Sequence, residues 1–233
     1  MKSSSYLLCA AVVLVCASPA VPFCLVPQPR LVCAEYFRSQ LVVKAKLVQT
    51  TTLHDKDDPE GISAYVYTLQ LNQVIRGSAT GRLQVYEGNE SGRATFDWVP
   101  NREYLLFLFY APDEKAWELD GCGNSGPLSS AARALSAIDA IKTSRSSTIR
   151  GVISEQALST PIAGVHVEAE SGKLRFAAVT NERGEFQFDV PPGRYKVSVV
   201  ETGRLFGEAD ISYRDLDDPI EPGGCAQVQL AER

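Results

Sequence analysis

The feature that most constrains the fold is a series of short strand-like segments separated by turns. On residues 65–71 and again on 185–190, apolar and polar side chains alternate with a period of two, typical of strands buried on one face. Turns such as Pro191-Pro192-Gly193 interrupt such segments about every ten residues. Residues 104–110 are apolar on both faces, which predicts a central strand covered on both sides. The chain is therefore expected to be all-β.

Two helices are expected between the strands. A short one covers about residues 34–39, and a longer one begins near Ser129, a plausible N-cap residue. The second helix has one apolar face, which we interpret as core packing rather than a cofactor or membrane surface. The polar, serine-rich residues 143–148 are expected to form a linker. The apolar face consists of Leu128, Ala132, Leu135, Ile138 and Ile141.

The first twenty residues have the order typical of a secretory signal peptide. Lys2 is followed by an apolar run over residues 7–17 and by small residues ending at Ala20. The run is too short for a membrane span, which needs about 20 apolar residues. Pro19 and Pro22 argue against an uncleaved anchor helix that continues further. We expect cleavage of residues 1–20 and a secreted, periplasmic or cell-surface protein.

Export would change the meaning of the cysteines. Cys24, Cys33, Cys122 and Cys225 remain after cleavage, and four cysteines in an exported chain favour two disulfides. They do not have the close Cys/His spacing of zinc sites, and the chain has only two histidines. No metal and no cofactor are therefore predicted.

A second domain is predicted over residues 149–233. Gly151-Val152 is followed in order by distinctive segments at 161–167, 180–186 and 190–195. These residues resemble the carboxypeptidase regulatory-like family, a transthyretin-like β-sandwich of the immunoglobulin-like type. The resemblance does not imply peptidase activity, because in the enzymes this module sits beside a separate zinc domain that is missing here.

The first domain, residues 21–142, is similar to the netrin-like module of tissue inhibitors of metalloproteinases. The similarity rests on Cys24 and Cys33, on segments 41–48 and 74–77, on Tyr104-Leu-Leu, and on Cys122 before a helix. It implies an OB-fold barrel with flanking short helices. It also implies a Cys24–Cys122 disulfide, whose loop of about 100 residues is worth up to about 4.7 kcal/mol in the chain-entropy model. Cys33 and Cys225 then either pair across the domains or remain buried thiols.

Neither inhibition of metalloproteinases by the N-terminus nor catalysis is expected. Inhibitors of this fold act through a Cys at position one, which here requires cleavage after Phe23, a residue that signal peptidase does not favour. Ser125 misses the spacing of a nucleophile elbow by one residue. His54 lies in an acidic loop, and His166 is expected to point outward from a strand. No catalytic residue is predicted, and the chain is interpreted as a non-enzyme.

Charge excludes further classes of ligand. The net charge of -5 and the lack of a basic block argue against nucleic acid. Two acidic stretches, residues 55–60 and 215–221, do not match an EF-hand calcium loop and are interpreted as turns. Calcium is therefore not predicted.

Three functions remain open at this level. The first is an interaction or scaffold protein that binds an unidentified extracellular protein or glycan. The second is a protease inhibitor that acts by a loop. The third is a carbohydrate-binding adhesive module using exposed Trp98 or Trp117, although buried tryptophans are the competing interpretation.

Overall fold

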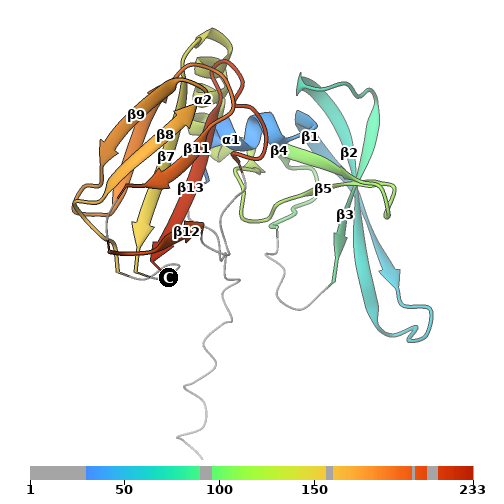
Figure 1. Cartoon of the computed structure of the whole chain (residues 1–233). Coiled ribbons are helices and arrows are strands. Elements are labelled where there is room, and N and C mark those ends of the chain that lie inside the picture. The colour runs from blue at the N-terminus through green and yellow to red at the C-terminus, as the bar shows by residue number, and fades with distance from the viewer. Residues whose placement is uncertain (1–29, 90–95, 156–159, 201–202, 209–214, 233) are drawn as a thin grey trace, which may run out of the picture.

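The computed structural model describes residues 30–89, 96–155, 160–200, 203–208 and 215–232. These residues form two β domains that lie side by side (Figure 1), and two helices that pack on the first domain. The all-β fold class is therefore confirmed. The predicted signal peptide and Cys24 lie outside the described residues.

The first domain is a five-stranded barrel, which the pairing of its first and fourth strands closes. Its sheet has the order β1-β2-β3-β5-β4, and β4 pairs back with β1, where Val43 lies opposite Leu106. Strands β3 and β5 run parallel, and the short β6 (Gly126–Pro127) extends the sheet beside β4. The barrel strands are β1 (Leu41–His54), β2 (Ile62–Arg76), β3 (Arg82–Gly88), β4 (Glu103–Ala111) and β5 (Ala116–Leu119).

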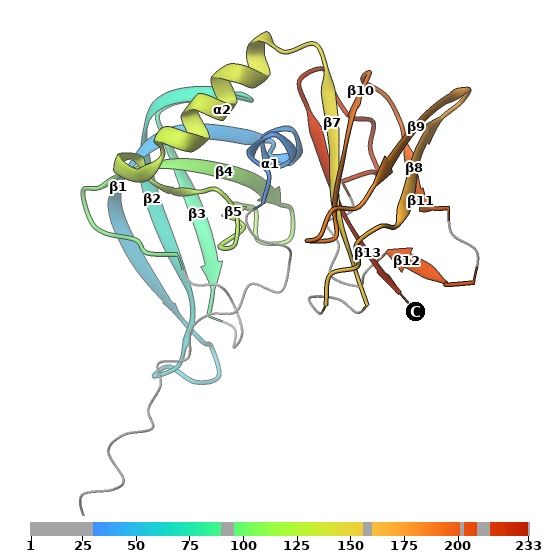
Figure 2. The same cartoon turned by 90° about the vertical axis from the view of Figure 1, so that its left-hand side faces the viewer.

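Strand β4 lies between two apolar layers, as its sequence predicted. Helices α1 (Val32–Arg38) and α2 (Ala132–Thr143) pack on the outer face of β1 and β4 (Figure 2). On β4, alternate side chains enter the barrel while those between them contact the helices. The inward residues are Tyr104, Leu106 and Leu108, and the outward ones are Leu105 and Phe107.

The helix boundaries differ from those expected. Helix α1 begins at Val32, and α2 begins at Ala132 with Ala131 as its N-cap residue. The expectation that Ser129 caps α2 was wrong, because a 3₁₀ turn, η1 (Leu128–Ser130), occupies these positions. The connection to the second domain is also shorter than the predicted linker, since the next strand already begins at Ser147.

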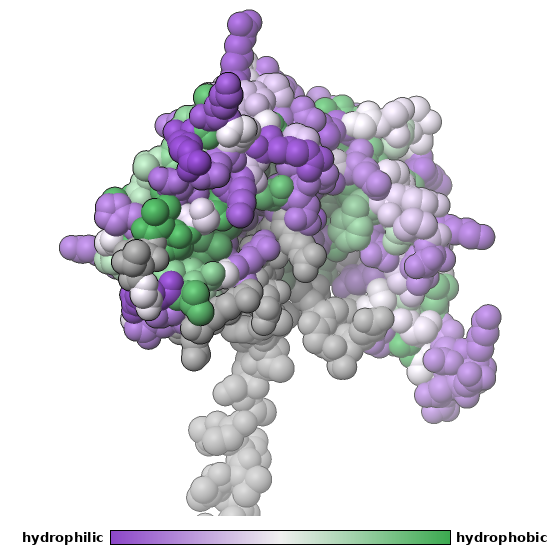
Figure 3. All heavy atoms as spheres, viewed as in Figure 1, coloured by the Kyte–Doolittle hydropathy of each residue, from purple (hydrophilic) through white to green (hydrophobic). Residues whose placement is uncertain are grey.

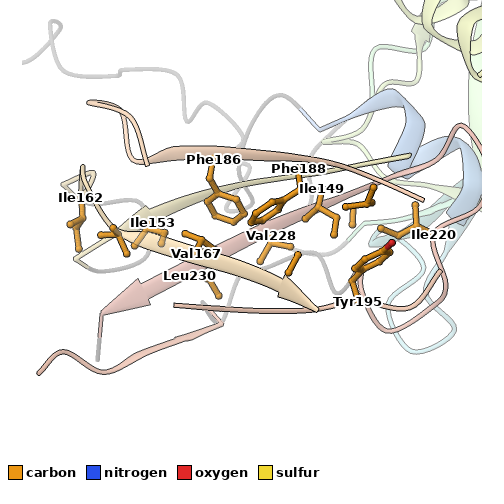
Figure 4. Packing of buried hydrophobic residues seen from close by; sticks show 14 residues of the cluster. Ile149, Ile153, Ile162, Val167, Phe186, Phe188, Tyr195, Ile220, Val228 and Leu230 are labelled. Carbon is orange, nitrogen blue, oxygen red and sulfur yellow. The ribbon is translucent and has the colours of Figure 1, made fainter. Parts of the chain in front are cut away.

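The second domain is a sandwich of two β-sheets, in which all strand pairs except β7–β13 are antiparallel. One sheet has the order β10-β7-β13-β12 and the other β11-β8-β9. Apolar side chains of the two sheets pack together in the core between them (Figure 4). The core includes Val167 of the second sheet and Phe186, Phe188, Val228 and Leu230 of the first. The strands are β7 (Ser147–Ser154), β8 (His166–Ser171), β9 (Leu174–Val179), β10 (Glu185–Val190), β11 (Lys196–Val199), β12 (Phe206–Glu208) and β13 (Cys225–Glu232).

The C-terminal strand occupies a central place in the sandwich. Strand β13 lies between β7 and β12 and runs parallel to β7, with Cys225 opposite Thr148. Its first residue therefore lies at the end of the sandwich where the chain enters from α2. This end faces α1, and α1 and β13 are in contact (Figure 2).

Candidate functional site

The two domains meet where α1 lies between the barrel and β13, a region we call the junction. The barrel side supplies Arg30, α1 and the loop of residues 120–125. The sandwich side supplies Asp215 and the start of β13. Segments far apart in the sequence therefore build the junction together.

A disulfide joins the domains at the junction. Cys33 of α1 is bonded to Cys225, the first residue of β13, with 5.5 Å between the Cα atoms. Of the two alternatives for these cysteines, the structure has the bonded one. The bond spans a sequence separation of 192 residues, and the chain-entropy model gives such a loop about 5 kcal/mol of stabilisation. Cys122 is also in a disulfide, but its expected partner Cys24 lies outside the described residues.

Asp215 is the ionic centre of the junction. Its side chain is only 2% exposed, and its Oδ1 lies 3.0 Å from Arg38 Nη1 and 3.8 Å from Arg30 Nη2. The backbone amide of Gln227 donates a 3.0 Å hydrogen bond to Asp215 Oδ2. Arg30 also contacts Asp120 of the barrel at 3.2 Å, so its guanidinium lies between carboxylates of both domains.

Glu35 fixes the other side of α1 to the barrel. Its Oε2 accepts hydrogen bonds from the Asn124 amide at 2.6 Å and from Asn124 Nδ2 at 2.7 Å. The same Asn124 side chain donates to the Arg30 carbonyl at 3.1 Å. Gly123 permits this approach, because a Cβ at that position would overlap Glu35 Oε1.

Burial governs the acid strength of both carboxyl groups. Desolvation raises the pKa of Asp215, and hydrogen bonds from Gln227 and Arg38 partly offset it. Desolvation likewise raises the pKa of Glu35, with Asn124 opposing the shift. These carboxylates are held in place by hydrogen bonds and arginines, so their direct role in the structure is to orient α1 between the domains.

The residues considered for catalysis are not brought together. His54 lies on the barrel and His166 on the sandwich, and both are exposed. The Ser125 hydroxyl accepts a 2.9 Å hydrogen bond from the Phe107 amide, which is a structural contact to β4. The described residues therefore offer no convergent nucleophile and base among these three side chains.

The tryptophans pack against other rings. Trp98 is stacked on Tyr67, with 4.6 Å between ring centroids, and it also contacts Phe96. Trp117 meets Tyr110 edge to face at 5.5 Å. Both tryptophans are half-buried and pack against the barrel core rather than standing free at the surface.

The two acidic stretches have different surroundings. Residues 55–60 form an exposed turn in which Asp55 Oδ1 accepts a hydrogen bond from the Asp57 amide, as the sequence predicted. Residues 215–218 also form a turn, as the sequence predicted, but the side chain of Asp215 is enclosed between the two domains. Within the described ranges, no group of three or more His, Cys, Asp or Glu side chains is placed to hold a metal ion.

A groove opens beside the junction. It has a volume of about 550 Å³ and lies between α2, residues 30–33 and the start of β7. A neighbouring hollow of about 520 Å³ covers the outer face of β7, and the two share Leu31 and Arg150. These surfaces have no signature in the sequence, because their residues come from segments as much as a hundred positions or more apart.

The fold and the junction define a two-domain β protein whose domains are joined by a disulfide. Comparison with known protein families identifies the second domain. Residues 148–212 match the family described as the carboxypeptidase regulatory-like domain, a non-catalytic type of domain. This match confirms the resemblance for the sandwich. The resemblance of the barrel to the netrin-like module stays a prediction.

Comparison of the whole chain with known proteins does not identify a family for it. No curated protein matches the chain. Among solved structures, the chain is similar to BcpA, the major pilin subunit of Bacillus cereus, with 7% identity and a TM-score of 0.28. The match covers 86% of this chain and 61% of the pilin chain, and so low a TM-score does not indicate a common fold. No helix in the described residues is long and apolar enough to span a bilayer.

Proposed function

We propose that this chain is an exported, non-catalytic interaction protein that binds a partner protein across both of its domains. In this proposal residues 1–20 are a signal peptide, and the barrel is a netrin-like module similar to that of tissue inhibitors of metalloproteinases. The Cys33–Cys225 disulfide is the observation that carries the proposal. Interfaces between domains of one chain usually allow relative motion, whereas here a covalent bond and a buried ion cluster oppose it.

A fixed orientation favours recognition over mechanical flexibility. Surfaces from both domains can then act as one preorganised site, which lowers the entropic cost of binding. A protein partner is favoured over a glycan because Trp98 and Trp117 pack within the barrel domain rather than standing free. The setting is extracellular or periplasmic, where disulfides persist.

Photo-crosslinking in the native host tests this function. A photoreactive amino acid at Ala137 of α2 or at Val152 of β7 should capture the same single protein, since Ala137 lines the groove and Val152 lines the neighbouring hollow. The same group at Lys173, in an exposed turn, is the control. Joint replacement of Cys33 and Cys225 by Ser should reduce capture. Equal capture from all three positions, or no capture from either Ala137 or Val152, would overturn the proposal.

The β1–β2 hairpin favours a second candidate, protease inhibition by a loop. The last seven residues of β1, 48–54, are exposed, and they lead to the acidic turn (Figure 3). A purified chain that inhibits a protease should lose inhibition when residues 55–61 are replaced by Asn-Gly, a turn compatible with a hairpin. Full inhibition by the shortened chain would exclude this hairpin as the inhibitory element.

A further inference from the structure

The charge of the groove beside the junction is opposite to that of the whole chain. The chain carries a net charge of -5, yet the described residues that line the groove include Arg30, Arg133 and Arg150 and no acidic side chain. A concave site lined by charges of one sign concentrates the electrostatic field there. The groove is therefore suited to a ligand with negative charge.

Two of the three arginines are available for a ligand. Arg30 is neutralised by Asp120 and Asp215 and is mostly buried. Arg133 of α2 and Arg150 of β7 are exposed, and the side chain of neither forms a hydrogen bond or ion pair with another residue in the described ranges. Arg150 also borders the neighbouring hollow on β7, but the lining of that hollow includes Glu185, so a ligand with negative charge is expected to follow the groove instead.

The remaining lining indicates what kind of anion fits. None of the described lining residues is aromatic, whereas single-stranded nucleic acids require stacking platforms. The floor consists of small side chains on α2, including Ala134 and Ala137, which let another backbone approach closely. The hydroxyls of Ser130 and Thr148 offer hydrogen bonds to main-chain amides. These features favour an extended polypeptide.

We propose that this groove binds an acidic peptide segment of the partner, with carboxylates paired to Arg133 and Arg150. Guanidinium groups bind carboxylates in a bidentate manner, which gives geometric specificity as well as attraction. The proposal rests on the proposed function, because it names the chemistry of the protein partner. Helix α2 contributes one arginine and the sandwich the other, so the disulfide between Cys33 and Cys225 holds the two charges in register.

The test uses the full chain and a fluorescently labelled octaglutamate peptide, followed by fluorescence anisotropy. Octaglutamate should bind, and octaglutamine should not. Arg133→Ala and Arg150→Ala should each weaken binding about tenfold, as expected for the loss of one charge-assisted contact. Arg145→Ala is the matched control, because Arg145 is an exposed arginine near the groove that does not line it. Raising the salt concentration should also weaken binding.

Three results would overturn the proposal. The first is equal binding of octaglutamate and octaglutamine, or no binding of either. The second is an Arg145→Ala effect as large as those at Arg133 and Arg150. The third is tighter binding of an acidic oligosaccharide, octagalacturonate, than of octaglutamate. If the peptide fails while crosslinking at Ala137 and Val152 still captures one protein, the proposed function survives and only the acidic peptide is excluded.

Discussion

The domain cores and the junction are both buried, but they are built from different chemistry. The three apolar clusters that the described residues form consist mainly of aliphatic and aromatic side chains from strands and helices. The junction instead buries Asp215, Glu35 and Arg30 around a disulfide. Apolar burial is not directional, whereas hydrogen-bonded ions and a disulfide require particular geometries. The cores therefore hold each domain together, and the junction sets the angle between them.

Removing the disulfide should have the largest effect on this division of roles. Joint Cys33→Ser and Cys225→Ser substitution should lower the free energy of unfolding by up to about 5 kcal/mol if the chain unfolds as one unit. It should also split a single calorimetric transition into two, one for each domain. A double variant that keeps one transition at the original temperature would show that the ions alone couple the domains.

A core substitution should affect one domain only. Leu106→Ala removes a fully buried side chain of β4 and should cost about 2–5 kcal/mol. When Leu106→Ala is made in the variant that lacks the Cys33–Cys225 disulfide, calorimetry should show a lower melting temperature for the barrel and an unchanged one for the sandwich. Phe188→Ala is the matched variant for the sandwich. If either variant shifts both transitions equally, the cores and the junction are not energetically separable.

Loss of one buried charge should have an intermediate effect. Asp215→Asn removes the shared partner of Arg30 and Arg38, and we expect a cost of about 2 kcal/mol in urea unfolding. The cost is limited because Arg30 keeps Asp120 and Arg38 is half exposed. Arg175→Ala is the control, since Arg175 pairs with glutamates at the surface and should cost less than about 1 kcal/mol. Equal costs would contradict the distinct role of the junction.

The smallest effect should be a change in pH dependence. The pKa of Glu35 is raised in the folded protein above its ordinary value of 4.5. The folded state therefore holds the proton more tightly than the unfolded state, and this carboxyl contributes stability at low pH that is lost as pH rises through the folded pKa. Urea midpoints compared between wild type and Glu35→Gln should show this loss only in wild type, between pH 4.5 and the raised pKa. If the urea midpoints of wild type and Glu35→Gln change in parallel with pH, the pKa of Glu35 is not raised in the folded protein.

The sequence predicted the elements of the cores well. Alternation on residues 185–190 and the doubly apolar run on 104–110 have local periods, and the structure places both as predicted. The closure of the barrel by β1 and β4 is not visible in such patterns. It depends on pairing between segments that the intervening strands bring together.

The junction could be predicted only in part. The cysteines allowed a link across the domains, since pairing is a property of residue type and number. Arg30 and Asp215 gave no comparable indication, because their partners lie far away in the sequence. Glu35 offered one usable sign, an acid between residues that α1 buries, Ala34 and Tyr36. The groove was not predicted because it belongs to neither domain alone.

The place of β13 in the middle of its sheet imposes an order on biogenesis. Strand β13 follows the other described strands of the sandwich in the sequence, so β7 is synthesised long before its central neighbour is available. The Cys33–Cys225 disulfide also forms only after β13 has been synthesised, because 192 positions separate the two cysteines. In an exported chain, as proposed above, the Cys33 thiol is open during that interval to oxidation with other cysteines. The protein should therefore mature slowly after its synthesis and depend on thiol–disulfide exchange to reach the native pairing.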